Sequence, residues 1–250
     1  MKRESGVAAI NDTGSRREPV FNVPAVVTAS VAVLAGVHAV RALLPPAADN
    51  WFVEAMAFIP ARYSGQMTEL PGGVYSAIGS FVTHLLIHAD IAHLGLNSAW
   101  LLVFGSAIAA RVGPMWFLLF AGFCGILGAA TFLALNWGLL APVVGASGAI
   151  AGLMGGTMRF MFSALDTGEL WRLREAPQTV RLMSMGETLR NKRVLIASGL
   201  FVVTNLGALI GFGGAKPGQP IAWEAHIGGF AAGLLAFGLF DRRSAAIDQE

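Results

Sequence analysis

The chain has 250 residues, of which 55% are hydrophobic and only 13% are charged. Soluble globular domains carry about 25% charged residues, so this composition excludes an ordinary soluble protein and indicates residence in a membrane. The single cysteine, Cys124, excludes an internal disulfide and therefore a disulfide-stapled secreted fold. The formal net charge is +2, but the basic residues are unevenly distributed along the chain.

Six apolar segments are candidates for membrane-spanning helices, since a helix needs about 20 apolar residues to cross a bilayer. In chain order they cover about 24–44, 91–110, 115–136, 145–162, 194–212 and 223–240. The segment 45–90 carries many apolar side chains, so we expect it to lie in or on the membrane. The sequence thus predicts an all-α membrane protein with a six-helix bundle over 24–241, flanked by tails at 1–23 and 242–250.

The basic residues predict the orientation of these spans. If the N-terminus is cytoplasmic, six crossings place every lysine and arginine except Arg41, Arg62 and Lys216 on the cytoplasmic side. This distribution follows the positive-inside rule and favours an even number of spans, so we expect both tails to be cytoplasmic. The basic connection 163–193 is interpreted as a solvated loop that helps to orient the chain, in preference to a site for anionic lipid.

Several polar side chains fall inside the predicted spans, where they are costly unless they are paired or face water. His93 and Asn97 lie four residues apart and therefore project from one face of the second span. Hydrogen bonds that pack helices together would explain this pair equally well. His38 and Asn205 have no such companion, and we interpret them as packing or cavity residues.

Ser147 and His226 begin the fourth and sixth spans, and each is accompanied by regularly spaced glycines. Small residues at such spacing let two helix backbones approach closely. Each run alone is more typical of helix packing than of catalysis, but together they would bring the two spans into contact. The glycines are Gly145, Gly148, Gly152 and Gly156 at the fourth span and Gly229 and Gly233 in the sixth.

Under the predicted topology, spans two, four and six all begin on the outer side. His93, Asn97, Ser147 and His226 then lie within the first turns of their spans, about 10 Å or less from the outer surface. A serine hydroxyl needs an adjacent base to act as a nucleophile, and His226 is the imidazole that glycine packing would bring beside Ser147. Asn97, His93 and the backbone N–H of Ser147 are candidate donors to an oxyanion.

Three motifs carry a resemblance to a known family, and they follow one another in the order of the predicted spans. They are His84-Leu-Leu-Ile-His88-Ala-Asp-Ile-Ala-His93-Leu-Gly-Leu-Asn97, Gly145-Ala-Ser147-Gly148, and Ala225-His226 with Gly229 and Gly233. With these motifs, the segment 71–241 resembles the rhomboid intramembrane serine proteases. The motifs are similar to the family's second-helix signature, its G-x-S-G motif and its sixth-helix motif.

The resemblance implies a catalytic dyad of Ser147 and His226, without the third acidic residue of the usual triad. It implies an oxyanion hole formed by Asn97, His93 and the main chain of Ser147, in a water-filled cavity open to the outside. It also implies that no cofactor or metal is used and that the substrates are transmembrane proteins, cleaved near the outer face through an acyl-enzyme. We expect contact with membrane lipid, no nucleic-acid partner, and residence in the bacterial inner membrane.

Two positions depart from the family's pattern. Ala151 stands four residues after the serine, where some members have an aromatic side chain that packs under the base, so support for His226 must come from elsewhere. The stretch 75–83 also lacks the Trp-Arg pair that many members carry before the second-helix signature. The packing of the first loop is therefore not predicted by the resemblance.

Other functions compete with proteolysis. A non-proteolytic rhomboid-like protein would bind transmembrane segments, although such relatives usually lack the serine or the histidine. A metal site could draw on His84, His88, Asp90 and His93, but the metalloprotease sequence H-E-x-x-H does not occur. A small transporter would need more intramembrane charges than the spans carry. A soluble hydrolase would need the motif G-x-S-x-G, which Ala149 interrupts.

Overall fold

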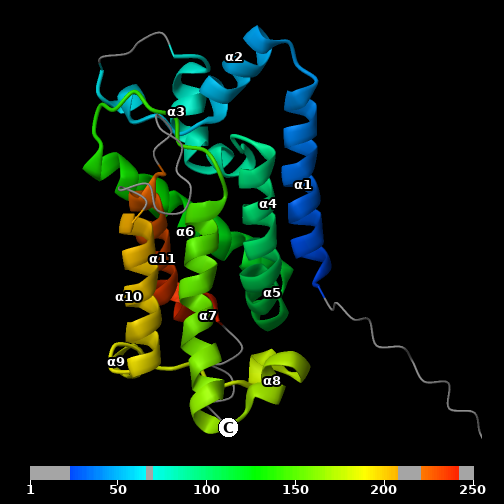
Figure 1. The fold of residues 1–250 in the computed structure, drawn as a ribbon, viewed down its shortest axis with the longest axis vertical. Coiled ribbons are helices and arrows are strands. Elements are labelled where there is room, and N and C mark those ends of the chain that lie inside the picture. The colour runs from blue at the N-terminus through cyan, green and yellow to red at the C-terminus, as the bar shows by residue number, and fades with distance from the viewer. Residues whose placement is uncertain (1–22, 66–69, 208–220, 242–250) are drawn as a thin grey trace, which may run out of the picture.

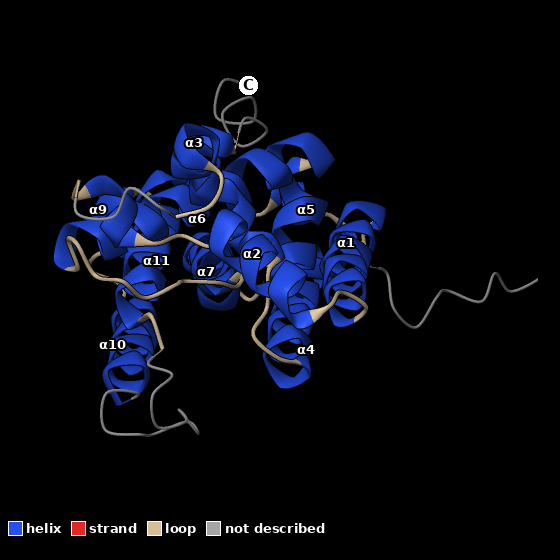
Figure 2. Cartoon of the chain, turned by 90° about the horizontal axis from the view of Figure 1, so that it is seen from above, coloured by secondary structure: helices blue, strands red, loops and turns tan. Residues whose placement is uncertain are grey.

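A computed structural model describes residues 23–65, 70–207 and 221–241, and over these ranges the chain forms helices and no strands (Figure 2). The helices make a bundle in which α2 (Pro46–Met56) and α3 (Gly73–Thr83) lie at one end, and α8 (Leu170–Glu175) and α9 (Met185–Thr188) lie at the other (Figure 1). The predicted tails lie outside the described residues except for Val23, as does the last part of the fifth predicted span.

Four helices of the described chain are long and apolar enough to cross a membrane. They correspond to the first, second, third and sixth predicted spans: α1 (Ala25–Ala42), the continuous helix Ile91–Val112, α6 (Pro114–Leu135) and α11 (Trp223–Phe240). The second of these comprises α4 (Ile91–Trp100), the π-helical turn η3 (Leu101–Gly105) and α5 (Ser106–Val112).

The remaining predicted spans correspond to α7 (Ser147–Thr167) and α10 (Lys192–Gly207), which do not meet that criterion of length and apolarity. The described part of α10 has only 16 residues. In α7 the reason is physical: most of its residues are buried by neighbouring helices, so glycines and Arg159 replace the large apolar side chains that lipid would require. The count of six spans therefore stays a prediction.

Local sequence signals fix where the second and third spans begin. The carboxylate of Asp90 accepts a hydrogen bond from the backbone N–H of His93 at 2.8 Å, which caps the first turn of α4. Gly113 adopts a φ of 85°, a conformation that other residues rarely adopt, and Pro114 directly follows it as the first residue of α6. The chain therefore reverses direction sharply between the second and third spans.

The segment between α1 and α4 is structured. It contains α2, the short helix η1 (Pro60–Tyr63), α3 and the 3-10 turn η2 (His84–Leu86). Phe58 and Val143 exchange two backbone hydrogen bonds, of 3.0 and 2.8 Å, which tie this segment to the loop that precedes α7. Several large apolar side chains of α3 are exposed, among them Tyr75 at 87% and Ile78 at 73%. The predicted location at the membrane surface rests on the apolar content of the segment 45–90, of which Phe58 and Ile59 are buried within the protein. That location remains a prediction.

The centre of the bundle is the contact between α7 and α11, both of which also pack against α6. A methyl group added to Gly229 would overlap the carbonyl oxygen of Gly148, and one added to Gly233 would overlap that of Gly152. The two backbones are therefore in direct contact, as closely spaced glycines allow. The predicted glycine faces of the fourth and sixth spans lie against each other.

Because no space remains between these backbones, Gly229→Ala should force α7 and α11 apart. We expect the free energy of unfolding in detergent to fall by about 1–3 kcal/mol, the usual cost of overpacking. Gly199→Ala in α10 is the matched control, because an added methyl group there meets no atom within 4 Å. That change should be neutral or stabilising by up to about 1 kcal/mol. Equal effects of the two substitutions on the unfolding midpoint would contradict the close contact.

A fully buried ion pair closes the end of the bundle near α8. The guanidinium of Arg111 donates to Asp241 Oδ2 from Nη2 at 2.7 Å and from Nε at 3.0 Å, and neither side chain is exposed. Arg111 also donates to the carbonyl oxygen of Pro177 at 2.6 Å and lies over the ring of Phe160. These contacts join α5, the connection after α8 and the end of α11.

Removing one partner of this pair leaves an uncompensated buried charge, so Asp241→Leu should destabilise the protein by about 3–5 kcal/mol. The double variant Arg111→Met with Asp241→Leu removes both charges and should recover much of that loss. Thermal unfolding in detergent would measure both effects. A double variant less stable than Asp241→Leu would show that the cost does not come from the unpaired charge.

Candidate active site

Ser147 and His226 come together at the contact between α7 and α11. The Oγ atom of Ser147 lies 2.7 Å from Nε2 of His226, which is a hydrogen bond. Ser147 is the first residue of α7, and His226 lies in the first turn of α11. Both residues are partly buried.

The packing of the glycines explains why these two side chains meet. Gly148 follows Ser147 directly, and its carbonyl oxygen is the atom that a side chain on Gly229 would strike. Gly145 adopts a φ of 112°, which lets the chain turn abruptly from the preceding loop into α7. The contact between Gly148, next to Ser147, and Gly229, one turn after His226, therefore sets the distance between the hydroxyl and the imidazole.

His93 and Asn97 border the same place from α4. A methyl group added to Gly145 would lie 2.7 Å from His93 Nε2 and 3.8 Å from Asn97 Nδ2, so both side chains face the backbone just before Ser147. Asn97 is buried and donates one hydrogen bond to the carbonyl oxygen of His93 at 3.0 Å. An amide group carries two N–H donors, so Asn97 retains one for a ligand.

The start of α7 adds backbone donors. The first N–H groups of a helix have no partner within that helix, and the helix dipole makes this end electropositive. Ser147 supplies the first of these groups in α7, and no side chain caps the helix there. Figure 1 shows α4, α7 and α11 all beginning towards the end of the bundle that carries α2 and α3. The structure thus brings His93, Asn97, Ser147 and His226 into one region.

The structure adds one residue that the sequence analysis missed. Asn205 of α10 places its Oδ1 atom 2.7 Å from Nδ1 of His226, so both ring nitrogens of the histidine have partners. From the sequence, Asn205 was interpreted as a packing or cavity residue because it has no companion four residues away, as His93 has in Asn97. The available signal was an amide inside an apolar span, which needs a partner that another helix can supply.

The family comparison covers this whole region: the family model for the rhomboid domain matches residues 75–243. This chain belongs to the rhomboid family. The matched range includes every residue of the region just described and excludes α1. Family membership and the four apolar helices together identify an integral membrane protein. A comparison with curated proteins gave no match.

Two other histidines that the sequence singled out, His84 and His88, contact residues that border the rhomboid Ser–His pair: Gly145 donates to the carbonyl oxygen of His84, and His88 packs against His93. His84 is buried, and its Nδ1 atom lies 2.7 Å from the carbonyl oxygen of Ser80. His88 is also fully buried, with its ring 5.1 Å from that of His93. Over the described parts of the chain, no group of three or more His, Cys, Asp and Glu side chains is arranged to hold a metal ion.

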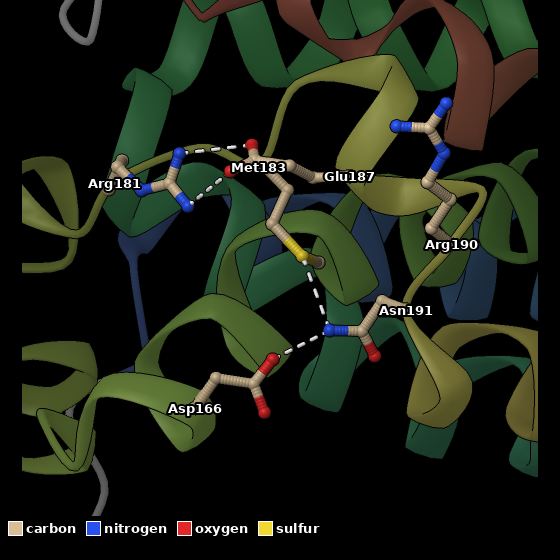
Figure 3. Close-up of a pocket in the computed structure, with 6 residues that line it drawn as sticks. All are labelled: Asp166, Arg181, Met183, Glu187, Arg190 and Asn191. Carbon is tan, nitrogen blue, oxygen red and sulfur yellow. Dashed lines mark hydrogen bonds and ion pairs between the residues drawn. The ribbon is translucent and has the colours of Figure 1, made fainter.

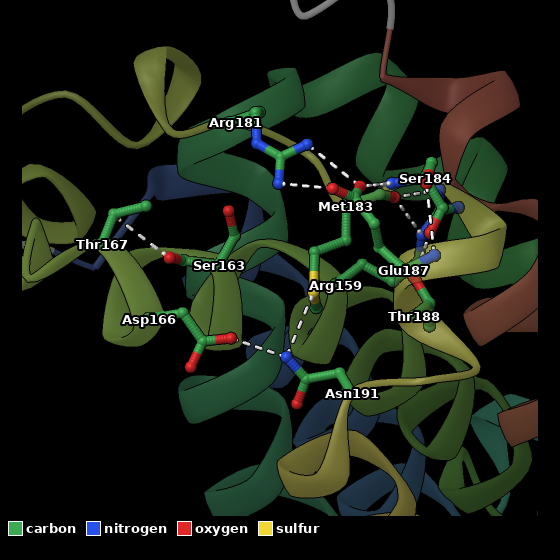
Figure 4. Close-up of polar contacts among 10 residues, drawn as sticks. All are labelled: Arg159, Ser163, Asp166, Thr167, Arg181, Met183, Ser184, Glu187, Thr188 and Asn191. Atoms are coloured by element: carbon green, nitrogen blue, oxygen red, sulfur yellow. Dashed lines mark hydrogen bonds and ion pairs between the residues drawn. The ribbon is translucent and has the colours of Figure 1, made fainter.

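A pocket in this rhomboid protein lies at the end of α7 opposite to Ser147 (Figure 3). Its lining side chains bond to one another: Arg181 donates to both carboxylate oxygens of Glu187, and Asn191 donates to Asp166 (Figure 4). Hydrogen bonds from Arg181 and from Ser184 hold the pKa of Glu187 at about 2. This network ties α7 to α9 and to the start of α10, far from Ser147.

Proposed function

We propose that this rhomboid-family protein is an intramembrane serine protease that cleaves transmembrane segments of other membrane proteins. The observation that carries the proposal is the 2.7 Å hydrogen bond between Ser147 Oγ and His226 Nε2. A serine hydroxyl is a weak nucleophile unless a base accepts its proton, and this geometry provides that base. Asn97 and His93 face the backbone just before Ser147, where α7 begins, and their N–H groups support the same reaction.

The reaction follows from these positions. His226 takes the hydroxyl proton while Ser147 Oγ attacks the carbonyl carbon of the scissile peptide bond. The oxyanion that forms receives hydrogen bonds from Asn97 and the main chain at Ser147. The protonated imidazole then gives its proton to the leaving amine, and the acyl-enzyme remains. Water, activated by His226, hydrolyses this ester and regenerates the free serine.

The substrate class follows from where the pair lies. Because α4, α7 and α11 begin at the same end of the bundle, the pair sits near one membrane face rather than at the middle of the bilayer. The distribution of basic residues supports the outer face as the location of the pair and the cytoplasm as the location of both tails. The setting that we propose is the bacterial inner membrane. A transmembrane helix must unwind locally to expose a peptide bond, so small or helix-weakening residues near its outer end should favour cleavage.

A second candidate function is that of a rhomboid-family protein without proteolytic activity, which binds transmembrane segments without cleaving them. The presence of both Ser147 and His226 in hydrogen-bond contact favours the protease, because binding alone needs neither side chain. The two functions differ in whether a bound segment is cleaved or is released uncleaved.

Co-reconstitution in liposomes tests the proposal. The purified protein is mixed with a single-span substrate that carries glycine and alanine near the outer end of its transmembrane segment, and products are mapped by mass spectrometry. We expect one cut in that outer part of the segment. A matched substrate with a continuous polyleucine segment is the control and should be cleaved far more slowly. Crosslinking of the first substrate to the protein without any cleavage would support the binding function instead.

A further inference from the structure

The side chain of Asn205 has a fixed orientation in the chain of hydrogen bonds behind His226. Its Nδ2 atom donates to the carbonyl oxygen of Phe201, one turn earlier in α10, at 2.8 Å. A carbonyl oxygen can only accept, so the nitrogen of the amide must face Phe201. The Oδ1 atom, which can also only accept, is left facing His226 Nδ1 at 2.7 Å.

This orientation determines which nitrogen of His226 carries the proton. Because Asn205 Oδ1 has no hydrogen to donate, Nδ1 of the imidazole must be the donor in their contact. A neutral imidazole carries a single N–H, so Nε2 is then unprotonated and can accept. Nε2 is the atom that faces Ser147 Oγ. The hydrogen bonds therefore run in one direction, from the serine hydroxyl to the histidine, then to Asn205, then to the backbone of α10.

We propose that Asn205 is a positioning residue that holds His226 in the tautomer and ring orientation needed to take the proton of Ser147. The inference rests on the proposed protease function and deepens it. In serine hydrolases with a catalytic triad, an acidic side chain performs this task, and most of the activity is lost when the histidine is held in the wrong tautomer. Here a neutral amide from another helix performs it.

The sequence around Ser147 makes such support necessary. Ala151 stands one turn after the serine in α7, and its methyl group is too small to hold an imidazole ring by stacking. Asn205 stands on α10, which packs against both α7 and α11. The orientation of His226 therefore depends on where α10 packs, and not only on the contact between α7 and α11.

Three variants test the role of Asn205: Asn205→Leu, Asn205→Asp and Thr204→Val. Leucine keeps the approximate volume but cannot accept a hydrogen bond, whereas aspartate restores an acceptor at the same place. Thr204 is the matched control, because its hydroxyl is exposed and donates only to carbonyl oxygens of its own helix, at 2.9 Å. Each variant is reconstituted with the glycine-containing substrate, and kcat, KM and the pH profile of kcat/KM are measured beside the unfolding midpoint.

We expect Asn205→Leu to lower kcat about 10- to 100-fold with little change in KM, by analogy with lost hydrogen bonds that orient metal-binding imidazoles. Asn205→Asp should recover most of the activity. It should also move the acid limb of the pH profile to higher pH, because a carboxylate stabilises the imidazolium form of His226 and thereby raises the pKa of the imidazole. Thr204→Val should match the unchanged protein in both respects.

The outcomes separate this inference from the proposed function. If the unchanged protein cleaves the substrate and Asn205→Leu cleaves it equally fast, the positioning role is wrong and the protease function stands. The role is also wrong if Asn205→Asp is as slow as Asn205→Leu with an unshifted pH profile, since that pattern marks a purely structural defect. If the unchanged protein does not cleave any substrate, the proposed function itself fails.

Discussion

Ser147→Ala should reduce cleavage of a transmembrane substrate by on the order of 10⁴- to 10⁶-fold, and His226→Ala should reduce it by a similar factor. The reason is that the hydroxyl and the imidazole, 2.7 Å apart, act as one unit: the nucleophile is inert without its base, and the base has no partner without the nucleophile. The double variant should therefore be no slower than either single variant, because losses within one catalytic unit do not add.

Initial rates in liposomes would measure this loss, with unfolding midpoints to show that each variant is folded. Ser30→Ala is a suitable control, because the Ser30 hydroxyl lies in α1 and donates only to the carbonyl oxygen of Val26. The cleavage rate of this variant should stay within about twofold of the rate of the unchanged protein, because substitutions away from a functional site usually have small effects. Cleavage at undiminished rate by either dyad variant would refute the assignment of the nucleophile and base.

Asn97→Ala should produce the second largest loss, about 100- to 1000-fold in kcat, which is the usual cost of removing one oxyanion donor. The amide of Asn97 is buried beside Gly145 and keeps one N–H free after donating to the carbonyl oxygen of His93. This donor would act on charge that develops only in the transition state, so KM should change little. Asn97→Asp should be at least as slow, since a carboxylate in place of the amide repels the oxyanion.

Single-turnover rates with a saturating substrate concentration would separate this effect from substrate binding. A loss smaller than about threefold in both Asn97 variants, with folded protein, would mean that the oxyanion is stabilised elsewhere, since a lost donor of this kind costs far more. A rise in KM with unchanged kcat would instead assign Asn97 to substrate binding.

The sequence predicted the elements that follow from a pattern within a single segment of the chain. Runs of apolar residues identified the helices Ala25–Ala42, Ile91–Val112, Pro114–Leu135 and Trp223–Phe240, which the structure contains with small shifts at their ends. The regular spacing of glycines from Gly148 in α7 and from Gly229 in α11 predicted the contact that brings Ser147 to His226, because small residues let two helix backbones approach closely. The family match to residues 75–243 agrees with the resemblance drawn from the three motifs.

The parts that the sequence did not predict depend on contacts between distant segments. Asn205 carries the one amide side chain of α10, and only the packing of α10 beside α11 gives it His226 as a partner. The pair of backbone hydrogen bonds between Phe58 and Val143 joins residues whose pairing no local pattern marks. The burial of α7 explains why a helix at the centre of the bundle can lack the apolar content of a lipid-facing span.

Covalent labelling of Ser147 in native membranes tests the central claim most directly, because it requires no knowledge of the substrate. A fluorophosphonate reacts with a serine that a neighbouring base activates, and peptide mass spectrometry locates the adduct. We predict an adduct on Ser147 of the unchanged protein and a labelling rate at least 100-fold lower in His226→Ala, in line with the loss of a general base. Failure to label Ser147, or an equal rate in His226→Ala, would contradict the account.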